Sequence, residues 1–253
     1  ETFGPVGFLV NNLFLASLVP SVVVANRIGQ GIGWGFTHSV AGRWRWGLFG
    51  QIALLLLPLF LLYVGTSALL SPRPQITPHP ELLVMLVIVW LTTPLQCAGE
   101  EYGFRGWFLQ NVGGLFANRI AAWVVPTVLS TGLFALLHGS PDPWILADLA
   151  VFAIGVSVMT WRTGGLEAAV ALHTLNNMVV MHLGLLLGGF DDSIVGPDTT
   201  GSPVAVVFTL IVQGAAVTLV WWWAQRRGVQ RHTTGPTRPR YRLPLPVGAG
   251  RPQ

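Results

Sequence analysis

Charged residues are scarce in this chain. Asp, Glu, Lys and Arg make up 9% of its 253 residues, whereas hydrophobic residues make up 52% and the mean hydropathy is +0.60. A soluble domain carries roughly 25% charged residues, so this chain has too few polar side chains to solvate a globular surface. The composition therefore predicts a membrane protein, and the length is sufficient for several spans of about 20 residues.

Lysine is absent, and all 14 basic residues are arginines. The pI of about 10.2 would indicate a nucleic-acid partner in a soluble protein. In a chain this apolar, basic residues instead set the orientation in the membrane, so we expect the lipid bilayer as a partner and no nucleic acid. Cys97 is the only cysteine, which excludes an internal disulfide framework.

Three common catalytic signatures are also missing. The chain contains no HExxH, no GxSxG and no CxxC pair. Thermolysin-type zinc chemistry, serine hydrolase chemistry and thiol redox chemistry therefore lose their usual sequence support.

Long apolar runs recur along the chain, separated by short clusters of Gly, Pro, Arg and Asp. Backbone groups in lipid need internal partners, so these runs predict helices, and period-two alternation typical of a membrane barrel is absent. We predict an all-α polytopic bundle of about seven spans, at residues 6–25, 47–70, 82–104, 120–138, 144–161, 166–187 and 203–224. These spans form one transmembrane domain, residues 1–227, followed by a Pro- and Arg-rich tail, residues 228–253, which we predict to be disordered.

The arginines predict the orientation of the bundle. When the spans alternate in direction, every arginine except Arg73 falls on one side of the membrane, and seven of them lie from Arg226 onward. The opposite loops hold the acidic residues Glu81, Asp142, Asp191, Asp192 and Asp198. The positive-inside rule then places the N-terminus outside and the tail in the cytoplasm.

Ionisable residues inside apolar spans are expensive and usually functional. The first set is Glu100-Glu101-x-x-x-Arg105, at the end of the third predicted span. Glu101 and Arg105 are four residues apart on a helix, which predicts an ion pair. Adjacent residues point about 100° apart, so Glu100 faces elsewhere and is free to meet another helix.

Two further sets contain histidine. Phe134-x-x-x-His138 and His173-x-x-x-Asn177 each place two side chains on one face of a predicted helix. Each set alone is compatible with a purely structural role in packing or helix–helix hydrogen bonding.

Taken together, the three sets indicate one hydrolytic site. A carboxylate beside a histidine can activate water as a general base, and a second histidine with an asparagine amide can stabilise an oxyanion. The same residues, Glu100, His138 and His173, could instead hold a zinc ion. The residues themselves leave this choice open.

In this order, the three motifs resemble the CPBP family, also called Abi, of intramembrane proteases related to type II CAAX prenyl endopeptidases. The resemblance covers residues 82–180. It implies that Glu100 and His138 activate water, while His173 and Asn177 form the oxyanion site. Glu101, Arg105 and Phe134 would support that geometry. Members have been described both as metalloproteases and as metal-independent glutamate proteases.

The predicted function is an intramembrane endopeptidase acting on hydrophobic or membrane-associated peptides in a bacterial plasma membrane. Two alternatives stay open: a non-catalytic scaffold that binds or regulates another membrane protein, and a transporter or channel. The sequence identifies neither a protein partner nor the natural substrate.

The predicted spans leave one geometric difficulty. They put Glu100 and His173 toward the cytoplasmic side but His138 near the outer end of its helix. Either Pro126 kinks the fourth span, or the third helix continues past Arg105 and residues 106–118 dip into the protein. We expect the second.

Overall fold

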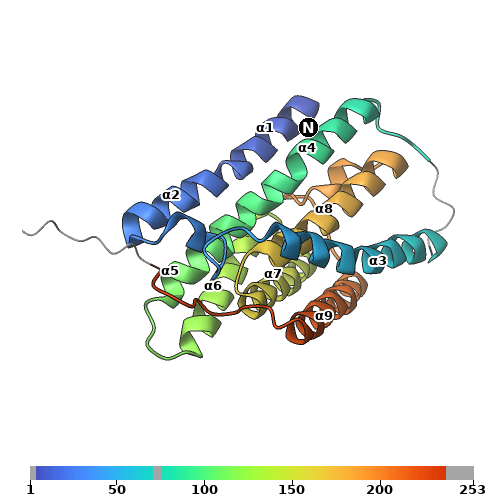
Figure 1. Ribbon diagram of the computed structural model, residues 1–253. Helices are drawn as coiled ribbons and strands as arrows, with labels where there is room; N and C mark the ends of the chain where they lie inside the picture. Colours follow the sequence, from blue (N-terminus) through green and yellow to red (C-terminus); the bar gives the residue numbers. More distant parts are fainter. Residues whose placement is uncertain (1–3, 71–75, 238–253) are drawn as a thin grey trace, which may run out of the picture.

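The computed structural model describes residues 4–70 and 76–237, and within these ranges the chain contains no β-strand. The predicted all-α fold is confirmed. Figure 1 shows the order of the elements along the chain. The helices are α1 (Pro5–Ala16), α2 (Leu18–Gln30), η1 (Trp34–Thr37), α3 (Trp46–Leu70), α4 (Leu82–Glu101), η2 (Tyr102–Phe108), α5 (Leu109–Gly113), α6 (Ala121–Leu137), α7 (Pro143–Thr163), α8 (Glu167–Leu187), η3 (Asp191–Ser193) and α9 (Pro203–Arg226).

Six helical segments in the described part of the chain are long and apolar enough to cross a membrane. Two of them are composite: α1 and α2 together form Pro5–Gln30, and α4, η2 and α5 together form the 32-residue run Leu82–Gly113. The predicted span at residues 120–138 is a helix, but α6 has only 17 residues and is too short to count with the six. At 1.5 Å per residue it reaches about 26 Å, less than the roughly 30 Å of a hydrocarbon core.

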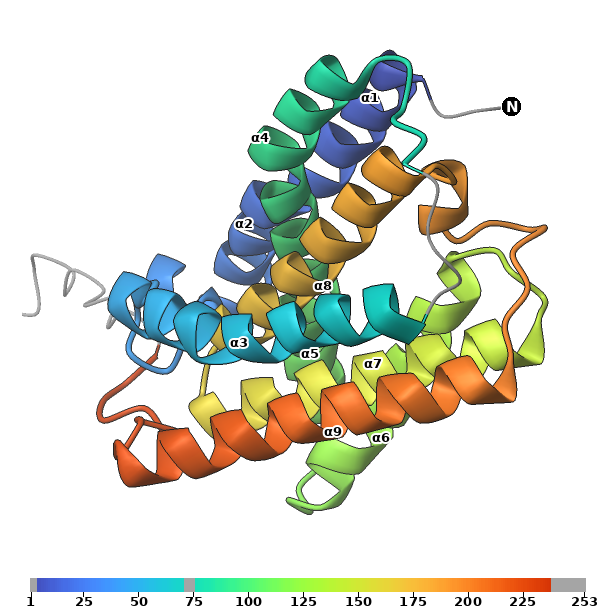
Figure 2. The ribbon, with the colours of Figure 1, turned by 90° about the vertical axis from the view of Figure 1, so that its right-hand side faces the viewer.

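The helices form two groups that run in different directions. In Figure 2, α1, α4 and α8 run steeply, whereas α3, α7 and α9 run across them. Contacts within the groups join α1 to α4, α4 to α8 and α7 to α9, and α8 also contacts α3 and α7. Helix α8 therefore lies at the junction, and its neighbour α4 carries the first polar motif.

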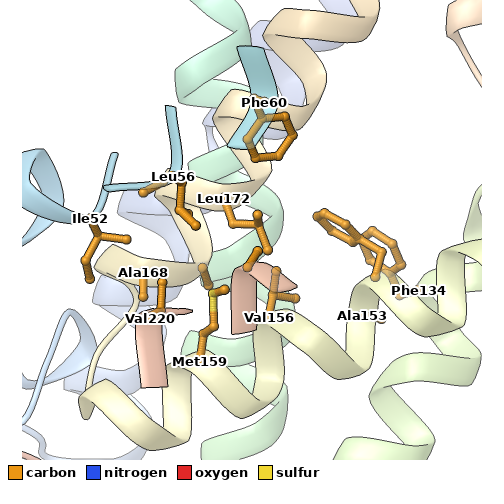
Figure 3. Packing of buried hydrophobic residues seen from close by; sticks show 14 residues of the cluster. Ile52, Leu56, Phe60, Phe134, Ala153, Val156, Met159, Ala168, Leu172 and Val220 are labelled. Carbon is orange, nitrogen blue, oxygen red and sulfur yellow. The ribbon is translucent and has the colours of Figure 1, made fainter. Parts of the chain in front are cut away.

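The largest hydrophobic cluster fills this junction. Figure 3 shows Ile52, Leu56 and Phe60 of α3 pointing toward residues of α7, α8 and α9. These α3 residues are spaced four apart, so they line one face of the helix. Small residues such as Ala153 and Ala168, both fully buried, let the helix backbones approach closely. The cluster holds α8 against three other helices.

One end of the molecule carries Arg43, Arg45 and Arg227 and is called the arginine-rich end below. An ion pair there joins the residue before α3 to the first residue of α8. The Arg45 guanidinium donates to both carboxylate oxygens of buried Glu167, at 2.8 and 2.7 Å, and to the Thr163 carbonyl at 3.0 Å. This links the start of α3 to the turn between α7 and α8. The side of the membrane on which this end lies stays a prediction.

The first ten residues of the predicted disordered tail have defined contacts. The Gly33 amide donates to the Thr237 carbonyl at 2.8 Å, and the Arg231 guanidinium lies 4.3 Å from the centre of the Trp161 ring. Residues 228–237 therefore lie against the bundle. The Thr237 carbonyl accepts from the Gly33 amide, and the Arg231 cation lies over the Trp161 ring. Residues 238–253 and Arg73 fall outside the described residues.

Candidate active site

The first polar motif lies where α4 passes into a π-helical turn. Helix α4 ends at Glu101, η2 continues it as a π-helix, and α5 extends it to Gly113. The third helix therefore runs on past Arg105, as expected. Residues 114–120 do not dip into the protein, because they form an exposed connection to α6. A π-turn widens the helix by one residue per hydrogen bond and is frequently found at functional sites.

Glycine at position 99 allows α4 to approach α1 closely, just before the two glutamates. A Cβ atom at Gly99 would lie 1.9 Å from the carbonyl oxygen of Leu15. Any larger residue would push these backbones apart. The close approach therefore helps to determine where Glu100 and Glu101 lie.

Glu101 and Arg105 form a completely buried ion pair. Arg105 Nη1 lies 3.1 Å from Glu101 Oε1, and both side chains are inaccessible to solvent. Arg105 also donates to the Ala153 carbonyl at 3.1 Å and to Ser157 Oγ at 3.5 Å. The ion pair predicted from the four-residue spacing is thus confirmed. The two hydrogen bonds from Arg105 to Ala153 and Ser157 join η2 to α7.

His173 of α8 lies between the two glutamates. Its Nδ1 is 2.8 Å from Glu101 Oε1, and its Nε2 is 3.8 Å from Glu100 Oε2. A carboxylate oxygen accepts hydrogen bonds, so the contact with Glu101 places a proton on Nδ1 of His173. The ring also packs edge-on against Phe152, with 4.8 Å between centroids. Glu101 therefore orients the imidazole, and Nε2 faces Glu100.

Gln96 was not predicted as a site residue, but it connects two that were. Its amide nitrogen donates to Glu100 Oε1, and its Oε1 accepts from Asn177 Nδ2 at 3.4 Å. Gln96 lies one helical turn before Glu100 on the same face, and this spacing is the signal in the sequence that could have found it. The other oxygen of Glu100, Oε2, is buried and has no hydrogen-bond partner among the described residues.

His138 lies beside this group but does not join it directly. Its Nδ1 is 2.7 Å from the Phe134 carbonyl oxygen, and the described residues include no hydrogen bond or ion pair between His138 and Glu100. The Phe134 ring contacts both histidines, with its centroid 4.6 Å from the His138 ring and 6.3 Å from the His173 ring. His138 is thus connected to the other predicted site residues through Phe134 and not through a hydrogen bond to Glu100 among the described residues.

The predicted zinc ligands do not meet in this arrangement. No group of three or more His, Cys, Asp or Glu side chains in the described ranges is placed to hold a metal ion. Because His138 turns back toward its own helix, Glu100 and His173 lack the third ligand that a zinc site needs. Zinc binding by Glu100, His138 and His173 therefore stays a prediction.

Comparison with known proteins supports the resemblance. Residues 79–179, less than half of the chain, match the family described as type II CAAX prenyl endopeptidase Rce1-like. This segment contains all three motifs, so the match supports a relationship to the CPBP and CAAX proteases. The family match and the apolar helices together make it a multi-pass membrane protein.

One curated relative is similar to part of the chain. The uncharacterized protein YyaK of Bacillus subtilis (strain 168) is 30% identical over 100 residues, which are 37% of this chain and 32% of the relative. The match thus spans about a third of that relative's length. No solved structure is significantly similar to the chain.

Proposed function

We propose that the chain is an endopeptidase that hydrolyses peptide bonds of hydrophobic or membrane-associated peptides. The observation that carries the proposal is the setting of Glu100, whose buried Oε2 has no hydrogen-bond partner among the described residues and lies 3.8 Å from His173 Nε2. A buried carboxylate oxygen without a protein partner is an acceptor for water. The family description, which is that of an endopeptidase, supports the same assignment.

Glu100 acts as the general base in this proposal. A water bound at Oε2 transfers a proton to the carboxylate while its oxygen attacks the carbonyl carbon of the peptide bond. The new C–O bond turns the carbonyl oxygen into an oxyanion. When the C–N bond breaks, the proton held by Glu100 passes to the departing nitrogen, so the enzyme returns to its initial state.

His173 and Asn177 stabilise the oxyanion. With Nδ1 held by Glu101, the imidazole donates from Nε2 when both nitrogens carry protons. Asn177 supplies a second donor from the next turn of α8, tethered through its contact with Gln96.

The apolar setting of the site suggests the kind of substrate. The three motifs lie on α4–η2, α6 and α8, and the runs containing α4–η2 and α8 are apolar enough to cross a membrane. Peptides that reach such a site have to partition into or next to the bilayer. We propose a bacterial cytoplasmic membrane as the location, in line with the bacterial relative.

A cleavage assay with matched glutamate variants tests this function. The purified protein in detergent is incubated with a quenched fluorescent library of apolar peptides, alongside Glu100→Gln and Glu81→Gln. Loss of a general base lowers the rate by about 10²–10⁴-fold, so we expect this loss for Glu100→Gln only. Glu81 is exposed next to α4 and controls for the loss of one carboxylate.

The outcomes separate the alternatives. Cleavage by Glu100→Gln at the wild-type rate would refute the proposed base. No cleavage by the wild-type protein on any library member would favour the non-catalytic scaffold. A strong chelator added to the wild-type reaction tests the metal: retained cleavage supports a glutamate mechanism, and loss that zinc restores supports a metal site formed after His138 reorients.

A further inference from the structure

A cavity of about 540 Å³ opens at the arginine-rich end of the molecule, away from the three catalytic motifs. It lies between the beginning of α3 and the end of α9, which are on the same side of the molecule in Figure 2. Arginines and tryptophans dominate its lining. Its lining includes Arg43, Arg45, Trp46, Trp223 and Arg227.

The cavity carries positive charge that the described residues do not neutralise. Arg43 and Arg227 are exposed, and neither forms an ion pair with a carboxylate in the described part of the chain. Glu167 is the acidic residue closest to this lining, and both of its oxygens are used by Arg45. Arg45 therefore stabilises the loop, while Arg43 and Arg227 remain available to an anion.

The first turn of α3 borders the same cavity. Trp46, Gly47 and Leu48 line it and are the first three residues of a 25-residue helix. The amides of a first turn have no acceptor within their own helix, and the helix dipole favours an anion there. Guanidinium groups beside such amides are the donor set that proteins use for phosphate.

The surroundings of the cavity point to a lipid as the source of that phosphate. Trp46 is 74% exposed and Trp222 is 50% exposed, and indole rings favour the membrane–water interface. Both α3 and α9 continue from the cavity as helices apolar enough to span a membrane. A headgroup bound here would thus have its acyl chains beside lipid-facing helix surface.

We propose that this cavity binds the phosphate of an anionic phospholipid headgroup through Arg43, Arg227 and the first-turn amides of α3. Basic pockets between transmembrane helices are known binding sites for anionic headgroups. The proposal is independent of peptidase activity, because it concerns different residues and is tested by binding.

Native mass spectrometry of the full chain released from detergent tests the site. The protein is titrated with a phosphatidylglycerol or with a phosphatidylcholine of the same chain length. We expect a first phosphatidylglycerol to bind more tightly than phosphatidylcholine, and the variant Arg43→Gln/Arg227→Gln to lose about 30-fold in that affinity. This corresponds to about 2 kcal/mol, or about 1 kcal/mol per arginine.

The control is Arg119→Gln/Arg226→Gln, which removes two exposed arginines outside the cavity. Equal losses in the two double variants would overturn the proposal, because binding would then follow net charge alone. In a third arm, inorganic phosphate or glycerol phosphate is added to the lipid-bound protein, and displacement of the bound lipid is measured. Displacement at concentrations similar to that of the lipid would identify a free phosphate site and overturn the lipid assignment. Circular dichroism of each variant verifies the fold.

Discussion

Replacing Arg105 by methionine should destabilise the protein severely, because it leaves the carboxylate of Glu101 buried without its arginine partner. The two side chains are fully inaccessible to solvent, and Arg105 also donates to the Ala153 carbonyl and to Ser157. Methionine replaces only the aliphatic part of the arginine side chain and carries no charge, so the change removes the charged interactions and leaves the space of the guanidinium unfilled. Breaking one partner of a buried pair typically costs about 3–5 kcal/mol.

This cost translates into a large change in thermal stability. For a chain of this size each kcal/mol lowers Tm by about 2–4 °C, so Arg105→Met should lower it by roughly 6–20 °C. The assay is thermal unfolding in detergent, followed by circular dichroism. Arg119→Met is the matched control, because Arg119 is exposed, and its Tm should stay close to that of the wild type.

A double-mutant cycle shows whether the ion pair is the cause. Glu101→Gln alone leaves Arg105 uncompensated and should also be destabilising. Combined in one chain, the two changes should cost less than the sum of the single changes by about 1–3 kcal/mol. Additive effects, or an Arg105→Met variant as stable as the wild type, would refute the argument. Because Glu101 also holds His173, both single variants should lose peptide cleavage even at temperatures where they remain folded.

Three further changes test other parts of the structure. Gln96→Leu removes the hydrogen bond to Glu100, so kcat in the cleavage assay should fall about tenfold or more with a smaller change in KM. Gln96→Asn should show the same loss of kcat, because its shorter side chain cannot reach Glu100. Gly99→Ala should lower Tm, because the added Cβ clashes with the backbone of α1. Gly132→Ala has open space at its Cβ and should leave Tm unchanged or raise it. Equal effects on Tm would contradict the close approach of α4 to α1. Burial lowers the pKa of His38, so the unfolded chain takes up its proton at a higher pH than the folded chain. The stability that neutral His38 contributes is therefore present above about pH 6.5 and is lost as the pH falls, and His38→Gln should lose less Tm than the wild type between about pH 7.5 and 5.5.

The helices could be predicted closely because hydropathy is a local property. A run of about 20 apolar residues determines a membrane helix whatever its neighbours are, and the predicted runs at 47–70, 166–187 and 203–224 coincide with α3, α8 and α9 to within a few residues. The prediction of seven spans was less accurate at α6. Its 17 residues are mostly apolar, but it ends before Gly139, and the left-handed backbone of this glycine stops the helix.

The site was predictable where it depends on spacing within one helix. Glu101 and Arg105 are four residues apart, and so are Gln96 and Glu100, so each pair meets regardless of the rest of the fold. The placement of His138 was not predictable in this way. It depends on how α6 lies against η2 and α7, and on the Phe134 ring of the same motif, which contacts both histidines.

The amino-acid sequence by itself determined that the chain enters a membrane, where its helices begin and end, and which polar residues each helix carries. These properties follow from composition and from the 3.6-residue period, both of which act over short distances along the chain. Only the tertiary structure decided that His173 lies between Glu100 and Glu101, and that the start of α3 and the end of α9 enclose a basic cavity. Such contacts join residues far apart in the chain, so they depend on helix crossing and core packing, which no local pattern specifies.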